Sequence, residues 1–176
     1  MPHSPPPSPY EPDSPRPLWA PWRIDYIRSP KDGACFICAL AEKADSQPQE
    51  MVIARGNHCF MMMNTFPYNS GHILIAPYQH ASDLAELAEP CLTEIMTLTV
   101  RAKAVMTRLF NPDGFNFGFN FGAAAGAGLE EHVHAHLVPR WFGDTNFMPV
   151  LGNTRVMPEA LAATAQLLRD EWDKQS

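Results

Sequence analysis

The sequence has no apolar run long enough to cross a bilayer, and it has few basic residues. None of its hydrophobic stretches approaches the roughly 20 consecutive apolar residues that a transmembrane helix needs, so we expect no contact with a membrane. Its 13 lysines and arginines are outnumbered by 19 acidic residues, which gives a formal net charge of −6. This acidic balance argues against a general binder of nucleic-acid polymers, although a nucleotide site needs only a few local donors.

Targeting signals and disulfide patterns are also scarce. The N-terminus lacks a basic start followed by an apolar core, so no signal peptide is expected. The chain has four cysteines, and the Cys-x-x-Cys spacing of Cys35 and Cys38 more often indicates a metal or redox pair in a reducing compartment. Cys59 and Cys91 have no obvious partner and are expected to be buried apolar residues. We therefore expect a cytoplasmic protein.

The chain is long enough for one globular domain with a substantial core. It has 176 residues, of which 45% are hydrophobic, and neither an internal repeat nor a second domain is visible. Proline dominates residues 1–17 and no apolar positions recur there, so we expect a disordered tail. Residues 18–176 are expected to form a single domain.

Hydrophobic periodicity predicts the elements of this domain. Short strands are expected over residues 50–55, 58–63, 72–76 and 115–121. A long helix is expected over residues 90–110 and a C-terminal helix over residues 157–172, with Pro158 in its first turn. A short helix should follow Cys38, and Ser82 should cap a helical turn. This order predicts an α+β fold with a mostly antiparallel sheet, one long helix and one C-terminal helix.

Three histidines alternate with apolar residues near the end of the chain. His132, His134 and His136 are separated by Val133 and Ala135, so on a strand the three rings share one face, about 6.5–7 Å apart. A helix does not bring positions two apart together. A metal site made of these three histidines alone is one interpretation, but a row of ligands fits a tetrahedron poorly. Nucleophilic catalysis fits the row better, because one ring can attack while a neighbour binds anionic oxygens.

A loop of small residues, Gly122–Gly128, directly precedes this segment. Residues this small let backbone N–H groups approach an anion closely, and a run of them can form a concave anion site. A flexible turn is the alternative interpretation of the loop alone. Next to three histidines, we favour a phosphate cradle.

The run HVHAHLV resembles the histidine triad (HIT) pattern His-φ-His-φ-His-φ-φ, which is typical of a superfamily of nucleotide hydrolases and nucleotidyl transferases. The longer run HVHAHLVPRWFGDTNFMPV is similar to the branch that contains bacterial diadenosine tetraphosphate phosphorylases, and the similarity extends upstream to the region of Cys35. The resemblance implies a HIT-like nucleotide-binding catalytic domain over residues 18–176. It also implies that His134 attacks an α-phosphate and forms a covalent nucleotidyl-histidine.

The same resemblance assigns substrate contacts. His136 and Asn120, with the backbone of Gly126, Ala127 and Gly128, would hold phosphate oxygens, and Asn64 would bind the ribose hydroxyls. Apolar residues would enclose the base, although each is equally suited to the core; they are Phe36, Ile37, Leu40 and Met62. One departure is visible, because many hydrolases of the family have glutamine at the position of Gly128. This departure weakens the transfer of a hydrolase mechanism.

The resemblance also completes a metal set around Cys35 and Cys38. Some bacterial histidine triad proteins add a histidine after a Pro-x-x motif and the first triad histidine, which are His80 and His132 here. Two cysteines and two histidines are a normal closed set for structural zinc, and free thiols in a reducing cell are the alternative. Cys35, Cys38, His80 and His132 are therefore the expected zinc ligands, and no organic cofactor is expected.

The expected function is nucleotidyl transfer from dinucleoside polyphosphates, most specifically phosphorolysis of diadenosine tetraphosphate to ADP and ATP. The alternatives are a HIT-type hydrolase of dinucleoside polyphosphates or nucleoside phosphoramidates, and a nucleotide-binding protein without catalysis. The acceptor would be phosphate or water. The resemblance further suggests a homodimer.

Overall fold

The computed structural model describes residues 35–42, 50–144, 147 and 160–174. All of these except Phe147 belong to one compact unit, which comprises Pro30–Asp144 and Met157–Ser176. The tail expected over residues 1–17 lies outside the described residues. Among the helices that the structure describes, none combines the length and apolar character needed to span a bilayer.

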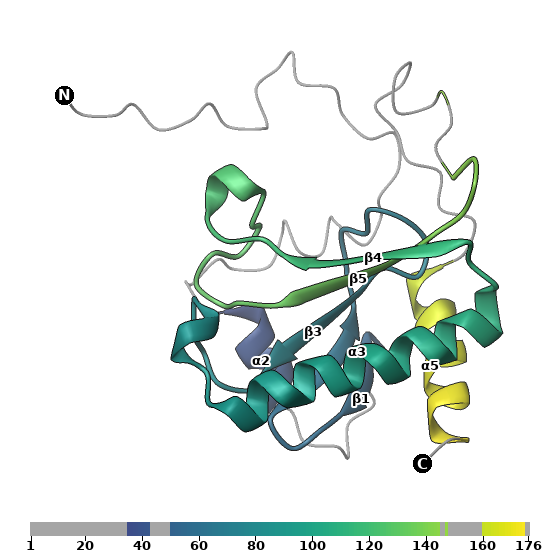
Figure 1. Cartoon of the computed structure of the whole chain (residues 1–176). Coiled ribbons are helices and arrows are strands. Elements are labelled where there is room, and N and C mark those ends of the chain that lie inside the picture. The colour runs from purple at the N-terminus through teal and green to yellow at the C-terminus, as the bar shows by residue number, and fades with distance from the viewer. Residues whose placement is uncertain (1–34, 43–49, 145–146, 148–159, 175–176) are drawn as a thin grey trace. The chain divides into compact units, whose positions relative to one another are not determined.

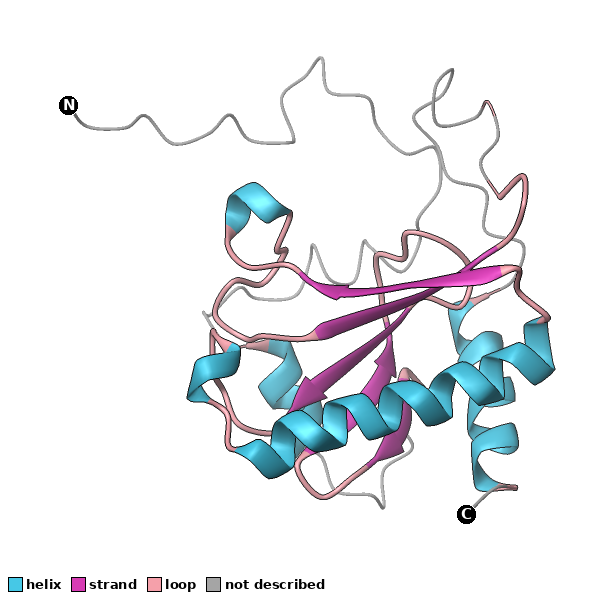
Figure 2. Cartoon of the chain, viewed as in Figure 1, coloured by secondary structure: helices cyan, strands magenta, loops and turns pink. Residues whose placement is uncertain are grey.

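A five-stranded antiparallel sheet forms the centre of this unit (Figures 1 and 2). Its spatial order is β1-β2-β3-β5-β4, and every neighbouring pair is antiparallel. The strands are β1 (Val52–Arg55), β2 (Cys59–Met63), β3 (Ile73–Pro77), β4 (Gly114–Phe119) and β5 (Ala135–Arg140). The sheet and its helices confirm the predicted α+β class.

Helices cover both faces of the sheet. The long helix α3 (Glu89–Phe110) contacts β2, β3 and β5, and α5 (Leu161–Asp173) contacts β1 and β2. In Figure 1, α3 crosses in front of the sheet, and the short helix α2 (Phe36–Glu42) lies behind it. The histidine site described below lies on the α2 side. His136 on β5 is paired with Leu74 on β3, and Leu74 belongs to the core cluster under α2.

Alternation along the strands divides the core between these two sides. One cluster joins Ile37 of α2 to alternate strand residues, namely Phe60 and Met62 of β2 and Leu74 and Ala76 of β3. The intervening residue Cys59 faces α3, where its Sγ atom lies 3.5 Å from that of Cys91. Both thiols are free and buried, as expected, but they are each other's partner, which local sequence did not indicate.

Two element boundaries differ from the predictions for clear reasons. The 3₁₀ turn Leu84–Glu86 is capped by Asp83 rather than Ser82, since Asp83 and Glu86 form a reciprocal capping box. Helix α5 begins at Leu161, because Ala160 has the extended dihedrals φ −68 and ψ 137. Pro158 and the predicted start at residue 157 lie outside the described residues.

Candidate active site

The histidine-rich segment lies directly before and within β5. The strand begins at Ala135, so the prediction that it includes His132 and His134 is wrong, and only His136 belongs to it. The rings of His134 and His136 are neighbours, with centroids 4.9 Å apart. The ring of His132 instead lies 5.1 Å from that of His80. The three histidines therefore divide between two sites and do not converge on one ion.

His134 presents a nucleophilic nitrogen. Its Nδ1 atom lies 2.7 Å from the backbone oxygen of His132, and a carbonyl oxygen can only accept, so Nδ1 carries the hydrogen. In the neutral ring the lone pair is then on Nε2. Burial lowers the pKa of His134 below its usual range, although the bond to the carbonyl opposes this shift. The ring is therefore neutral near pH 7 and its Nε2 is able to attack an electrophile.

A second tautomer is set by His72, a fully buried histidine that directly precedes β3. The backbone N–H of Tyr68 donates to His72 Nδ1 at 2.9 Å, so Nδ1 is an acceptor. In the neutral ring the hydrogen is on Nε2, which lies 3.0 Å from Nδ1 of His136 and donates to it. His136 must then carry its own hydrogen on Nε2. The backbone N–H of Tyr68 thus determines the tautomer of His136 through the ring of His72.

The Nε2 atom of His136 is a buried donor that has no hydrogen-bond partner among the described residues. Burial lowers the pKa of His136 to about 4, and the neighbouring His134 contributes to the shift. The ring is therefore neutral near pH 7. A buried polar group without a partner is rare and indicates a missing ligand or a functional role. Here it places an N–H donor beside the lone pair of His134, which suits an electrophile with anionic oxygens.

The strands leave space beside this pair of histidines. His136 is paired with Leu74 on β3 and with Gly118 on β4. A Cβ atom added to Gly118 would meet no atom within 4 Å, and the same is true of Gly126 and Gly128. Gly118 therefore leaves open space opposite His136, and Gly126 and Gly128 leave the backbone of the small-residue loop open to a ligand.

Asn120 and the small-residue loop are held together next to Tyr68. The side-chain amide of Asn120 donates to the Tyr68 hydroxyl at 3.2 Å and lies 3.5 Å from the Gly126 carbonyl. The Ala127 N–H donates to Gly122 O at 3.3 Å, so the loop already uses one of the three amides predicted to bind phosphate. The ring of Tyr68 stacks on that of His136, with centroids 5.7 Å apart. Tyr68 thus connects the loop to the histidine pair.

Asn64, the predicted ribose ligand, lies behind His72. It is only 8% exposed, and its side-chain oxygen accepts the Phe66 N–H at 2.8 Å. Its amide nitrogen lies 3.3 Å from Nδ1 of His72. In this conformation the side chain supports the loop between β2 and β3, and its predicted role toward ribose stays a prediction.

The four residues predicted to bind the base gather around α2. Ile37 and Met62 are fully buried, whereas Phe36 and Leu40 are half-buried. All four belong to the core cluster between α2 and the sheet or pack against it. Only Phe36 and Leu40 therefore offer surface to a ligand in this conformation.

The four predicted metal ligands come together in one cluster. Cys35, Cys38, His80 and His132 each offer one ligand atom, and these atoms lie within 4.8 Å of one another. Sγ of Cys35 and Sγ of Cys38 lie 3.3 Å and 3.5 Å from Nδ1 of His132. Sγ of Cys38 also lies 3.2 Å from Nδ1 of His80. A tetrahedral zinc ion with ordinary bond lengths separates sulfur and nitrogen ligands by about 3.5 Å, so these distances fit it.

The protonation of this cluster also suits a cation. The Nε2 atom of His132 lies 3.0 Å from the Pro77 carbonyl and donates to it, which leaves the Nδ1 lone pair facing the cysteines. Burial and the adjacent Cys35 raise the pKa of Cys38 to about 11. Two neighbouring thiolates are therefore unfavourable unless a cation offsets their charge. The residues present fit a divalent metal ion.

Sequence reasoning missed His72 and Tyr68 as parts of the site. His72 appeared only as the start of an apolar strand, and Tyr68 only as one residue of a loop. The spacing of local motifs carries no signal for either residue. Their contacts to His136 depend on how β3 pairs with β5, with Leu74 opposite His136.

Comparisons with known proteins show which family this chain is similar to. The family model of the HIT domain matches residues 45–143. AP-4-A phosphorylase of Mycobacterium tuberculosis is 37% identical over 165 residues, which cover 90% of this chain and 85% of that relative. Bis(5'-adenosyl)-triphosphatase of Dictyostelium discoideum is 32% identical over 81 residues, which cover 46% of this chain and 54% of that relative.

A solved structure shows the same fold. The crystal structure of a zinc-bound histidine triad family protein from Mycobacterium smegmatis superposes with a TM-score of 0.64 and 24% sequence identity. The superposition covers 81% of this chain and 96% of that chain. It supports the arrangement of the sheet and helices described above.

Proposed function

Because this chain belongs to the HIT domain family and is an enzyme of that family, we propose that it transfers a nucleotidyl group from a dinucleoside polyphosphate through His134. The preferred reaction is phosphorolysis of diadenosine tetraphosphate to ADP and ATP. The similarity to AP-4-A phosphorylase supports this substrate and acceptor. The observation that carries the proposal is that two neighbouring rings offer a nitrogen lone pair on His134 and an N–H on His136 that has no partner among the described residues.

In the first step, Nε2 of His134 attacks the α-phosphorus. An N–P bond forms, the bridging P–O bond breaks, and ATP leaves with the bonding electron pair. The His134 ring becomes positively charged, and its Nδ1–H bond to the His132 carbonyl stabilises that charge. The N–H of His136 donates to an oxygen on phosphorus, where negative charge develops in the transition state. Removing one such donor typically costs about 10²- to 10³-fold in kcat.

In the second step, an oxygen of inorganic phosphate attacks the same phosphorus. The new P–O bond forms as the N–P bond breaks, which gives ADP and returns His134 to its neutral state. Water as the acceptor would give AMP. Gly128 supports phosphate over water, because this chain lacks the glutamine side chain that many hydrolases of the family carry at that position.

We further propose that Cys35, Cys38, His80 and His132 hold structural zinc. The fit of the ligand distances and of the His132 tautomer supports this assignment. By coordinating these side chains, the ion would connect the α2 region to the segment before β5. With four protein ligands its coordination is complete, so the chain's own histidines carry the chemistry. Metal analysis of the purified protein tests this assignment directly.

The four free cysteines support action in the cytoplasm, where thiols stay reduced. We also propose that the protein is a homodimer, as the family resemblance suggests. Light scattering coupled to gel filtration tests the oligomeric state.

Incubation with diadenosine tetraphosphate, with and without inorganic phosphate, tests the reaction. Chromatography should show ADP and ATP only when phosphate is present. AMP formed without phosphate would overturn the phosphorylase and identify a hydrolase instead. Intact mass spectrometry of the quenched protein should show one adenylyl group, located on His134 by peptide mapping.

Substitution of the nucleophile separates catalysis from binding. His134→Ala should lower kcat by about 10³-fold or more while nucleotide binding remains. His58→Ala, at the exposed turn between β1 and β2, is a matched control and should keep wild-type turnover. A wild-type protein that binds nucleotide but turns over none would refute the enzymatic proposal.

A further inference from the structure

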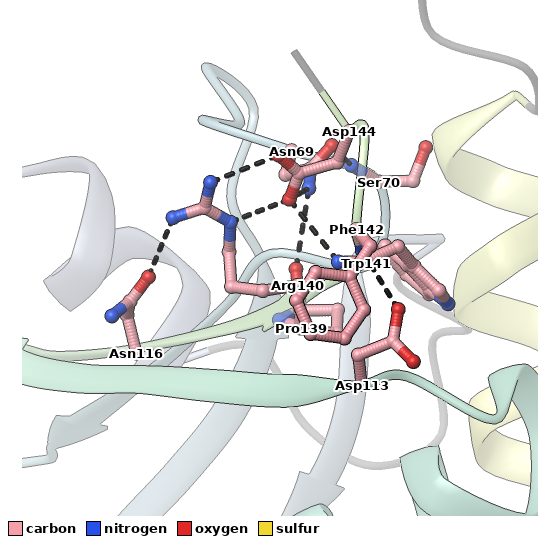
Figure 3. A network of polar contacts seen from close by, with 9 residues as sticks. All are labelled: Asn69, Ser70, Asp113, Asn116, Pro139, Arg140, Trp141, Phe142 and Asp144. Atoms are coloured by element: carbon pink, nitrogen blue, oxygen red, sulfur yellow. Dashed lines mark hydrogen bonds and ion pairs between the residues drawn. The ribbon is translucent and has the colours of Figure 1, made fainter.

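Arg140, the last residue of β5, and Asp144 form an ion pair at the centre of a polar network (Figure 3). The Asp144 carboxylate, whose side chain is only 9% exposed, accepts from Arg140 Nε at 2.6 Å and from Nη2 at 2.9 Å. It also accepts the Trp141 N–H at 3.2 Å. On its other side, the Arg140 guanidinium donates to Asn116 at 2.7 Å. This carboxylate is therefore fixed in place by charge and by several donors.

Asn69 connects this network to the loop that precedes β3. Its side-chain amide donates to Asp144 Oδ2 at 2.8 Å and to the Pro139 carbonyl at 3.3 Å. Its side-chain oxygen accepts the Ser70 N–H at 3.1 Å. Its backbone oxygen accepts the His72 N–H at 3.2 Å. Asn69 thus links this loop to the residues at the end of β5.

Asn69 follows directly after Tyr68, whose backbone N–H sets the tautomer of His72. Rotation of the chain at Asn69 would turn that N–H away from His72 Nδ1. His72 would then lose the bond that keeps its hydrogen on Nε2, and the donation to His136 would weaken. The contacts described for Asn69 and Asp144 run to the loop, to Arg140 and to the backbone after His136, so we treat both as positioning residues and not as catalytic ones.

We propose that Asn69, held by the Arg140–Asp144 pair, is a positioning residue that keeps the Tyr68 amide on His72 and thereby keeps the His136 hydrogen directed at the substrate. The kinetic part of this proposal rests on the proposed function. The tautomer part does not, because it concerns the free protein. Asn116 contacts the same arginine but does not connect it to the loop, which makes it a matched control.

Histidine ¹⁵N NMR of the free protein tests the proposal, alongside kinetics. In the wild type, Nδ1 of His72 should resonate as an unprotonated nitrogen and Nε2 as a protonated one. In Asn69→Ala the two signals should move toward each other, as two tautomers interconvert. With diadenosine tetraphosphate, kcat should fall about fivefold to tenfold with KM unchanged, the effect of one neutral hydrogen bond. Asn116→Ala should leave the nitrogen signals and kcat as in the wild type.

The outcomes separate positioning from mere stability. Unchanged His72 signals in a folded Asn69→Ala protein would overturn the proposal, whatever the activity. Equal losses in Asn116→Ala would also overturn it, because they would reflect general damage to the network. If Asn69→Ala does not fold, Asp144→Asn tests the same link and should change the His72 signals in the same way. This variant keeps the shape of the side chain and removes the charge that holds Asn69. If no dinucleoside polyphosphate is turned over, the proposed function fails while the NMR result still decides this proposal.

Discussion

Replacing His72 tests whether the fixed tautomer of His136 contributes to catalysis. His72→Phe keeps a ring in a fully buried position but removes both nitrogens. It leaves the Tyr68 N–H and Nδ1 of His136 without the partners that now lie at 2.9 Å and 3.0 Å. Each hydrogen bond contributes about 0.5–1.5 kcal/mol, so losing both should lower the free energy of unfolding by about 1–3 kcal/mol.

The effect on catalysis should be smaller than the loss of the nucleophile. One neutral hydrogen bond contributes about 0.5–1.5 kcal/mol, which corresponds to about a 2- to 13-fold decrease in kcat. His72→Gln should recover much of this decrease, since its amide oxygen can accept from Tyr68 while its amide nitrogen donates to His136.

The assay is steady-state turnover of diadenosine tetraphosphate with phosphate, at a temperature where urea unfolding shows each variant to be folded. Wild-type kcat in His72→Phe would refute the proposed role of the tautomer. A His72→Gln protein as slow as His72→Phe would refute it as well, because packing rather than hydrogen bonding would then explain the loss.

Three further predictions concern the metal cluster, pH and a loop anchor. Cys35→Ser should lower Tm by several degrees, and a zinc chelator should lower the wild-type Tm but leave that of the variant unchanged, as differential scanning fluorimetry can measure. The pKa of His136 is lowered to about 4, so its neutral form contributes stability that is present above pH 6.5 and is lost as pH falls toward 4. The urea-unfolding free energy of His136→Gln should therefore fall less steeply with pH across that window than that of the wild type. The Glu94 carboxylate accepts three backbone N–H groups of the turn between β1 and β2, at 2.6–2.9 Å, so Glu94→Gln should lower the unfolding free energy by about 1 kcal/mol, and an unchanged value would contradict this.

Much of the fold could be predicted because its information is local. Alternation indicated the strands, and the amphipathic pattern over residues 90–110 indicated α3, which the structure has at Glu89–Phe110. The cap of the 3₁₀ turn could also have been found, because Asp83 and Glu86 have the spacing of a capping box whereas Ser82 does not. The metal cluster was predicted by similarity to a family pattern, since its ligands come from three separate segments.

The spacing of the triad did not predict that His132 belongs to one site and that His134 and His136 belong to another. Period-two spacing predicts one shared face only where the backbone is a strand, and the strand starts at Ala135. His132 precedes it, and there the Pro77 carbonyl and the two cysteines orient its ring. A motif therefore identified the right residues but not which of them act together.

The support for His136 could not be predicted because it depends on strand register. His72 is 64 residues away in sequence, and it reaches His136 only because Leu74 is paired with that residue across β3 and β5. A shift of one residue would turn His72 to the α3 side and leave Nδ1 of His136 without its donor. Periodicity shows which residues share a face of one strand, but it does not show which residues of two strands lie opposite each other. Both the tautomer and the Asn69 connection are consequences of that register, so they became visible only once the pairing of β3 with β5 was known.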